Sequence, residues 1–159
     1  MTVRQGDVVK ERRRPLTFLR KVVLTTLQLA PCDRDVELCL TLTDDAGIQS
    51  LNGHYRGQDK PTDVLAFRLE DEQDSGFWLP EGVSRPLGDV IVSLDTVERQ
   101  ARENGNSLES ELAWVICHGS LHLLGYDHQT DEELAGMRER ERTVLNALGI
   151  ARSWPELWP

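Results

Sequence analysis

The sequence predicts an α/β or α+β fold, a single domain in which one small sheet is flanked by helices. Its 159 residues suit one domain with a single hydrophobic core. Hydrophobic residues make up 39% and charged residues 28%, the balance of a globular chain rather than a disordered one. Segments with the alternating pattern of strands are interleaved with segments of helical periodicity, and this order favours one sheet covered by helices.

The first predicted elements lie in the N-terminal part of the chain. Residues 1–15 form an N-terminal segment, in which we expect a short strand around Val8 and Val9. Pro15 suits the first turn of a helix, because the backbone N–H that proline lacks is not needed there. Apolar residues then recur at helical spacing as far as about Leu29, so the sequence predicts a helix over this stretch.

Two strands and a helix are predicted next. Residues 36–43 alternate apolar and polar side chains, which indicates a half-buried strand. Asp44 or Asp45 is suited to cap the helix that follows. The composition of residues 57–61 predicts a turn, and residues 62–67 then form a second strand.

The longest predicted loop covers residues 68–86, which are mainly polar and contain several glycines and prolines. The third strand follows at residues 88–94, where apolar side chains return. Asp95 is expected to cap the next helix, with Glu98 three residues later. Gly105 is expected to end that helix.

The last third of the chain is predicted to be helical. One helix begins at Asn106 or Ser107 and runs to Leu124. It is apolar on nearly all sides, so we expect it to be the central, buried helix of the domain. Residues 130–133 match a capping box for a final helix, and Gly149 is the natural end of that helix.

Composition also limits where the protein acts. No run of about 18 apolar residues occurs, and the N-terminus lacks the apolar centre of a secretory signal, so we expect a cytoplasmic protein without a membrane partner. The three cysteines suit reduced thiols better than a disulfide framework. A net charge of −9 argues against broad electrostatic binding of nucleic acid. Arg12, Arg13 and Arg14 form a local basic cluster, which is more often solvated than bound to a polyanion.

Three of the four histidines, His118, His122 and His128, fall within a stretch of eleven residues. His118 and His122 are four residues apart on the predicted helix, so they lie within about 40° of each other on one face. Gly125 interrupts the helix and allows the chain to turn, so that His128 can return toward the first pair. Neutral imidazole is the commonest protein metal ligand, and the pattern therefore predicts that the three rings bind one metal ion.

The predicted ligand set indicates a catalytic metal. Three protein ligands leave a fourth position open, as in catalytic zinc sites. Imidazole donors also suit nickel or copper. The alternative is that His118 and His122 are hydrogen-bonded core histidines and that His128 is a surface residue. The spacing of the three, with a glycine between the second and the third, favours the metal site.

Three neighbours of the histidines bear on the chemistry. Cys117 adjoins His118, but adjacent helical residues point about 100° apart, so it is not expected as a fourth ligand. Gly119 stands where the zinc-protease pattern H-E-x-x-H has its glutamate, which removes the base that a peptidase of that type needs. Asp127 either orients a ligand by accepting a hydrogen bond from its second ring nitrogen or is simply a turn residue.

Arg56 is the candidate for contacting substrate. It lies at a predicted helix-to-strand turn, from which its guanidinium could project into a cleft. Phosphodiester cleavage builds up negative charge, and arginine matches phosphate oxygens with paired donors. The alternative is a surface ion pair with Asp59 or Asp63. His54 is expected to be exposed and unrelated to the metal.

Three sequence motifs together carry a resemblance. They are HGSLHLLGYDH at residues 118–128, YRGQDKPTDVL at residues 55–65 and LGDV at residues 87–90. In this order they resemble the bacterial YbeY family of rRNA-maturation endoribonucleases. The resemblance covers a domain of roughly residues 16–150, outside which lie the N-terminal segment and a C-terminal tail of residues 151–159. Two positions depart from the family pattern, since Ala66 and Arg68 stand where the family usually has serine and proline.

The resemblance implies both a fold and an activity. It implies a mixed sheet of about four strands and one zinc ion bound by His118, His122 and His128. It implies single-strand-specific cleavage of RNA, in maturation of the 16S rRNA 3′ end and in ribosome quality control, with Arg56 as the functionally important arginine. The partners that it implies are an rRNA precursor and the ribosome or its proteins, and no DNA.

Our hypothesis from the sequence is metal-assisted hydrolysis of an RNA phosphodiester, with Arg56 stabilising the developing charge. The nucleophile is either water or a ribose 2′-hydroxyl, and the sequence identifies no side chain as a general base. One alternative is a metallohydrolase of another substrate, such as a peptide. The other is a ribosome-assembly factor whose metal is structural.

Overall fold

A mixed sheet of four strands forms the centre of the fold in the computed structural model, which describes residues 1–5, 12–30, 35–69 and 80–154. The strand order is β1-β2-β4-β3, in which β2 is parallel to β1 and β4, and β3 is antiparallel to β4. The described elements are β1 (Thr2–Gln5), α1 (Leu16–Leu29), β2 (Val36–Thr43), α2 (Asp45–Arg56), β3 (Val64–Arg68), β4 (Arg85–Ser93), α4 (Leu94–Glu103), α5 (Leu108–Leu123) and α6 (Asp131–Ala147). The predicted fold class, a small mixed sheet flanked by helices, is confirmed.

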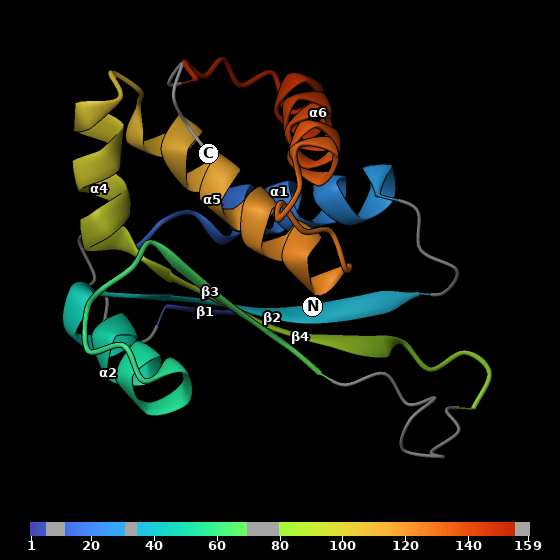
Figure 1. Ribbon diagram of the computed structural model, residues 1–159. Helices are drawn as coiled ribbons and strands as arrows, with labels where there is room; N and C mark the ends of the chain where they lie inside the picture. The colour runs from blue at the N-terminus through green and yellow to red at the C-terminus, as the bar shows by residue number, and fades with distance from the viewer. Residues whose placement is uncertain (6–11, 31–34, 70–79, 155–159) are drawn as a thin grey trace.

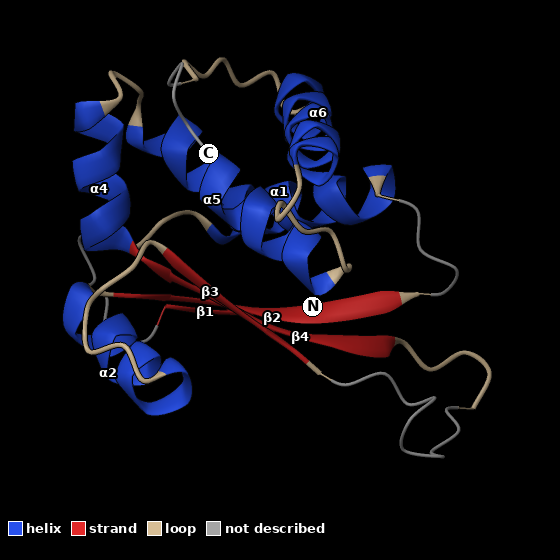
Figure 2. Ribbon diagram, viewed as in Figure 1, coloured by secondary structure: helices blue, strands red, loops and turns tan. Residues whose placement is uncertain are grey.

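The helices are divided unequally between the two faces of the sheet. Figures 1 and 2 show α1, α5 and α6 on one side and α2 on the other. α5 packs directly on β3 and β4 and also contacts α1, α4 and α6. The predicted position of this helix at the centre of the domain is therefore confirmed.

None of the helices in the described part of the chain combines the length and the apolar character needed to cross a bilayer.

Three of the predicted helix starts are made by the expected cap residues. The side chains of Asp44, Ser107 and Thr130 each accept a hydrogen bond from a backbone N–H in the first turn of α2, α5 and α6. Glu133 completes the capping box of α6 by bonding back to the Thr130 N–H, at 3.1 Å. These caps satisfy N–H groups that have no partner within a helix, which is why the local sequence predicts them well.

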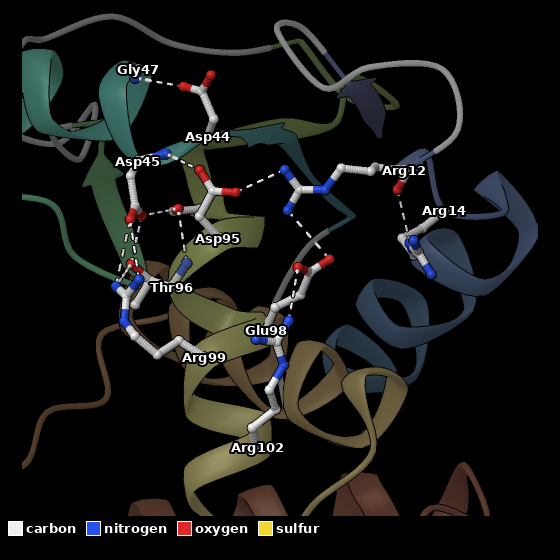
Figure 3. Close-up of polar contacts among 11 residues, drawn as sticks. Arg12, Arg14, Asp44, Asp45, Gly47, Asp95, Thr96, Glu98, Arg99 and Arg102 are labelled. Carbon is white, nitrogen blue, oxygen red and sulfur yellow. Dashed lines mark hydrogen bonds and ion pairs between the residues drawn. The ribbon is translucent and has the colours of Figure 1, made fainter.

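The predicted cap of α4 is wrong. Ser93, not Asp95, caps this helix, and its hydroxyl accepts a hydrogen bond from the Thr96 N–H at 3.3 Å. β4 ends where α4 begins, so the last strand residue, with its extended backbone, is the one that can serve as the cap. The Asp95 carboxylate instead accepts the Asp45 N–H at 2.9 Å and Nη1 of Arg12 at 2.7 Å (Figure 3).

The basic cluster at Arg12 to Arg14 is tied to the body of the protein. Arg12 forms ion pairs with Asp95 at 2.7 Å and with Glu98 at 3.3 Å, as Figure 3 shows. The hydrogen bond that Arg12 donates to Asp95 is the main reason why the pKa of Arg12 is raised. Nε of Arg14 donates to the Arg12 carbonyl at 2.9 Å. Acidic side chains of α4 thus compensate the Arg12 charge, so a polyanion is not needed to explain it.

Two of the predicted strands begin at other residues in the structure. β3 begins at Val64 rather than at residue 62, since the Asp63 carboxylate accepts the Val64 N–H at 2.7 Å just before the strand. β4 begins at Arg85, inside the predicted loop of residues 68–86, because Val36 of β2 pairs with it. Part of that predicted loop, residues 70–79, lies outside the described residues.

The N-terminal segment contributes a strand to the sheet. β1 pairs with β2 in parallel, and Thr2 is aligned with Cys39 and Gln5 with Leu42. The strand that we expected around Val8 and Val9 falls outside the described residues. β1 is an edge strand whose neighbour is β2. The first residues of the chain, which precede all three motifs in the sequence, therefore belong to the sheet.

Candidate metal centre

The histidines lie where the central helix reaches the surface. Twelve of the 16 residues of α5 are buried, and beyond its first two residues the helix is accessible only at His118 and His122. Both rings are half-buried, while His128, on the loop after the helix, is exposed. The i, i+4 spacing thus places the two imidazoles on the same face of α5, as predicted, at the place where this buried helix is accessible to solvent.

A glycine turn brings the third histidine back. α5 ends at its C-cap, Leu124, and Gly125 follows with a positive φ of 95°, which a residue with a Cβ rarely adopts. The Gly125 N–H bonds to the carbonyl of His122 at 3.0 Å, and the Tyr126 N–H bonds to the carbonyl of Leu121 at 3.1 Å. This close reversal redirects the chain across the end of the helix, so that His128 meets the other two rings.

The three rings form a compact group. His118 Nε2 and His122 Nε2 lie 3.1 Å apart. The His128 ring centroid is 5.4 Å from that of His118 and 5.1 Å from that of His122. One ligand nitrogen from each ring can be chosen so that all three lie within 4.8 Å of one another. The structure therefore brings together the three residues that the sequence predicted as metal ligands.

The chemistry of this group fits a transition-metal ion. Two nitrogens bound tetrahedrally to one zinc at about 2.0–2.1 Å lie roughly 3.3 Å apart, close to the separation of the His118 and His122 nitrogens. Burial, followed by the neighbouring His118 and His128, lowers the pKa of His122 to about 4. The ring is therefore neutral near pH 7 and has a lone pair to offer. The three histidines form a group that could hold a metal ion.

Asp127 is a turn residue, the second of the two roles that the sequence left open. Its carboxylate accepts the His128 N–H at 2.8 Å and an amide hydrogen of Gln129 at 2.7 Å. The first of these bonds is the main reason why the pKa of Asp127 is lowered. Asp127 shapes the loop that carries His128 and makes no hydrogen bond to a ring nitrogen among its described contacts.

A carboxylate that was not predicted from the sequence contacts His118. Oε1 of Glu141, on α6, lies 2.7 Å from Nδ1 of His118. Glu141 has a relative exposure of only 2%. One sequence feature could have revealed it: Glu141 lies four residues after Met137 and four before Leu145, so it interrupts the apolar stripe of α6 with a charge. An acidic residue at such a position needs a partner inside the protein.

Cys117 lies on another side of α5. It packs with Ala30, Leu121, Met137 and Val144, and burial raises the pKa of its thiol to about 12. Such a thiol is protonated at neutral pH and gives no thiolate ligand. The Cys117 thiol thus lies in the apolar cluster between α1, α5 and α6, apart from the group of three imidazoles.

Gly119 faces the sheet. A Cβ built at this position would lie 2.8 Å from Cγ1 of Val90 and 2.9 Å from Cγ2 of Val64. The glycine therefore allows α5 to approach β3 and β4 closely, and a glutamate here would have no room. The position that carries the base in the zinc-protease pattern is turned into the core in this protein, which argues against a peptidase of that type.

Arg56 lies in the last turn of α2, on an exposed surface, at the outer edge of the sheet. Its Nη2 donates to the carbonyl of Ala66 at 3.3 Å, and its guanidinium carbon lies 5.9 Å from the centre of the Phe67 ring. β3 is an edge strand, so this carbonyl has no strand partner on its outer side. Among the described contacts Arg56 pairs with neither Asp59 nor Asp63, and it does not touch the imidazole rings.

A second arginine, Arg68, lies closer to the histidines. Val64, Ala66 and Arg68 share one face of β3, the face on which Val64 meets α5 at Gly119. Nη1 of Arg68 is 3.3 Å from the position that a Cβ of Gly125 would take. The guanidinium therefore lies beside the turn that connects the second and third histidines. Edge strand β3 thus associates with two exposed guanidinium groups, one at Ala66 and one at its last residue.

Comparison with known proteins identifies the family of this chain. Residues 2–149 match the family model of endoribonuclease YbeY. An endoribonuclease YbeY of Roseiflexus sp. is 47% identical over 136 residues, covering 85% of this chain and 84% of the relative. One of Desulforamulus reducens is 44% identical over 139 residues, covering 86% and 88%. A solution structure of a protein from Thermotoga maritima aligns with a TM-score of 0.57 and 29% identity, over 93% of this chain and 91% of that one. The chain belongs to the endoribonuclease YbeY family.

Proposed function

We propose that this protein is a metal-dependent endoribonuclease that cleaves single-stranded RNA, with His118, His122 and His128 as the ligands of one zinc ion. The observation that carries the proposal is the compact group of three imidazoles at the surface end of a buried helix. The names of its relatives, all endoribonucleases, supply the reaction class. Nickel or another divalent transition metal would suit the same nitrogen donors.

The residues of the chain prepare the site for that chemistry. A zinc ion with three protein ligands supplies Lewis-acid chemistry for hydrolysis of a phosphodiester. Burial keeps the His122 ring neutral, and the Gly125 turn holds His128 against the first two rings. Because α5 is packed on all other sides, the ligands are held by a rigid element rather than by a flexible loop alone.

Arg56 and Arg68 are proposed to bind the RNA backbone. Both side chains are exposed, and both lie along β3, one at Ala66 and the other at the Gly125 turn. A guanidinium matches two phosphate oxygens at once, so a strand of RNA that follows the edge of β3 would meet both charges on its way to the histidines. In this arrangement Arg68 binds the phosphate nearer the metal, and Arg56 stabilises charge on an adjacent group.

The biological role that we propose is maturation of the 16S rRNA 3′ end and ribosome quality control in the cytoplasm. This role is supported by the resemblance of three motifs, at residues 55–65, 87–90 and 118–128, to those of the family, in the same order. The net charge of −9 also supports a role for partners, since an acidic protein does not attract RNA broadly. The ribosome or ribosomal proteins would then bring the precursor to the two arginines.

The structural-metal alternative is weaker for a geometric reason. Structural zinc sites usually have four protein ligands, often thiolates. Here three imidazoles converge, and the nearest thiol in sequence, Cys117, is protonated and packed elsewhere. An open coordination position is the arrangement expected of a catalytic site.

Cleavage of defined rRNA fragments tests the proposal. The substrates are a single strand that spans the 16S 3′ end, the same sequence in a duplex and the corresponding single-stranded DNA. Zinc-loaded wild-type protein is expected to cut the RNA single strand, and His118→Ala, matched for folding by circular dichroism, to lose this activity. His54→Ala is the control, because His54 is exposed and lies outside the triad. Wild-type activity in a folded His118→Ala variant contradicts the proposed site.

The arginines are tested with the same RNA. Arg56→Ala and Arg68→Ala are each expected to reduce cleavage while leaving zinc content unchanged, because neither side chain is a metal ligand. The loss for Arg56→Ala should lie mainly in kcat, and that for Arg68→Ala mainly in KM, since the first is assigned to developing charge and the second to binding. Unchanged cleavage in both variants would show that the edge of β3 does not contact RNA.

A further inference from the structure

Glu141 makes a short contact with His118, one of the three proposed metal ligands. The Glu141 Oε1 to His118 Nδ1 distance is 2.7 Å, and the two residues are 23 positions apart in the sequence. The Glu141 side chain is 3% exposed and that of His118 15%. A carboxylate removed from water in this way is costly unless it is well hydrogen-bonded, so its position in the apolar stripe of α6 calls for a function.

The carboxylate is held rigidly. Met137 and Leu145, one turn before and one turn after Glu141 on α6, are both buried, with 2% relative exposure. α6 packs against α1 and α5, and the capping box at Thr130 and Glu133 secures its first turn. Glu141 therefore approaches His118 from a fixed helix, and the direction of its hydrogen bond is set by the packing of α6 on α5.

This hydrogen bond determines which nitrogen of His118 is free. A carboxylate only accepts hydrogen bonds, so the ring hydrogen of neutral His118 must lie on Nδ1. The lone pair then lies on Nε2, the nitrogen that faces His122 Nε2 at 3.1 Å. Without Glu141 the other tautomer, with the hydrogen on Nε2, would become available, and in that form the nitrogen that faces the other histidines could not bind a metal.

We propose that Glu141 is a positioning residue of the metal centre, which fixes the tautomer and orientation of His118 and adds a compensating negative charge behind the ligand. The inference rests on the proposed metal site. It also links the metal to the fold, because α6 must be docked on α5 for the carboxylate to reach His118. Metal binding and docking of the last helix therefore stabilise each other.

Two substitutions separate positioning from packing. Glu141→Leu fills the buried space and removes the acceptor. Glu141→Gln keeps the size and offers a carbonyl oxygen as a neutral acceptor. Glu139→Gln, on the exposed side of the same helix, is the matched control for loss of an acidic charge. The first readout is zinc affinity, measured by competition with a chromophoric chelator. The second is the tautomer of His118 in the metal-free protein, measured by long-range ¹H–¹⁵N NMR.

The expected result is a graded loss. Zinc affinity should fall about 10–100-fold in Glu141→Leu, fall less in Glu141→Gln and stay unchanged in Glu139→Gln. The NMR signals of His118 should show the Nδ1–H tautomer in the wild type and a shift toward the Nε2–H tautomer in Glu141→Leu. Circular dichroism of the metal-free variants checks folding. If Glu141→Leu does not fold, the comparison of Glu141→Gln with Glu139→Gln decides.

The outcomes distinguish this inference from the proposed function. If the wild type binds zinc, His118→Ala abolishes that binding and the folded Glu141 variants bind zinc as the wild type does, the positioning role of Glu141 is wrong and the metal site stands. If His118→Ala leaves zinc binding unchanged, the metal site itself is wrong. An unchanged Nδ1–H tautomer in folded Glu141→Leu also overturns the inference, because the carboxylate would then not be what selects it.

Discussion

His118 Nε2 and His122 Nε2 lie 3.1 Å apart at the end of α5, where the helix is otherwise enclosed by the sheet and by its neighbouring helices. Two imidazole nitrogens this close cannot both be protonated at low cost. A bound cation would remove the conflict, because both nitrogens would then direct a lone pair to it. The stability of the folded protein should therefore depend on the pH and on whether a metal ion is bound.

The first prediction concerns pH in the metal-free protein. The pKa of His122 is lowered to about 4 from an ordinary value of 6.5, mainly by burial. Between these two pH values the unfolded chain binds more protons at this residue than the folded one, so the free energy of unfolding rises with pH across this window. Stability present above pH 6.5 is thus lost as the pH falls toward 4. NMR titration of His122, together with urea unfolding at several pH values, measures both effects.

The control for this prediction is His122→Asn, which cannot titrate and should show a shallower rise of stability between pH 4 and 6.5. The prediction fails if His122 titrates near 6.5 in the folded, metal-free protein.

The second prediction concerns stabilisation by zinc. A ligand that binds only the folded state stabilises it by about 2.7 kcal/mol when its free concentration is 100 times Kd. For a chain of this size that corresponds to an increase in Tm of roughly 5–10 °C. Wild-type protein should show this increase in differential scanning fluorimetry when zinc is added. His128→Ala should lose most of it and His54→Ala should keep it, because only His128 belongs to the triad. An equal increase in all three proteins would point to zinc binding elsewhere.

The third prediction concerns the approach of α5 to the sheet. A methyl group at Gly119 would lie 2.8 Å from a Val90 methyl and 2.9 Å from a Val64 methyl, so Gly119→Ala must push the helix or the valines apart. We expect a loss of about 1–3 kcal/mol in the free energy of unfolding, measured in urea.

Gly136 of α6 provides the opposite case. A Cβ there would meet nothing within 4 Å, so Gly136→Ala should stabilise the protein by about 0.5–1 kcal/mol through helix propensity alone. Equal effects of the two substitutions would mean that contact with the sheet does not limit residue 119.

The fourth prediction concerns the residues after α6. Arg152 forms an ion pair with the fully buried Glu111 at 3.0 Å, and its guanidinium lies 4.1 Å from the centre of the Trp114 ring and 4.5 Å from that of Trp154. Arg152→Ala would leave the Glu111 charge without its cation. Removing one partner of a buried ion pair lowers the free energy of unfolding by about 3 kcal/mol or more. Urea unfolding would measure this loss.

Arg142→Ala is the comparison for Arg152→Ala. The Arg142 guanidinium also lies near Trp154, at 5.4 Å, but this residue is exposed. Its loss should change stability by no more than about 0.5 kcal/mol. A similarly small effect of Arg152→Ala would contradict the role that we assign to its buried ion pair. Residues 151–159 were predicted only as a tail, whereas residues 151–154 pack against α5 through these contacts.

Much of the secondary structure could be predicted because its causes are local. The caps at Asp44, Ser107 and Thr130 act within one helical turn, and the alternation in residues 36–43 directly reflects a strand with one buried face. The prediction was wrong where a contact between residues far apart in the sequence determines the structure. Arg85 belongs to β4 because Val36 pairs with it, and Asp95 is not a cap because Arg12 and the Asp45 N–H hold its carboxylate.

The same distinction divides the candidate site. Sequence alone determined that His118 and His122 share a helical face and that Gly125 could turn the chain toward His128, because helix geometry and glycine's φ range are properties of neighbouring residues. Only the tertiary structure decided that Glu141, 23 residues away from His118, supports that ring, and that Arg68 lies beside the Gly125 turn. Those contacts depend on how α6 and β3 pack against α5, and packing is settled by the whole core rather than by any one segment.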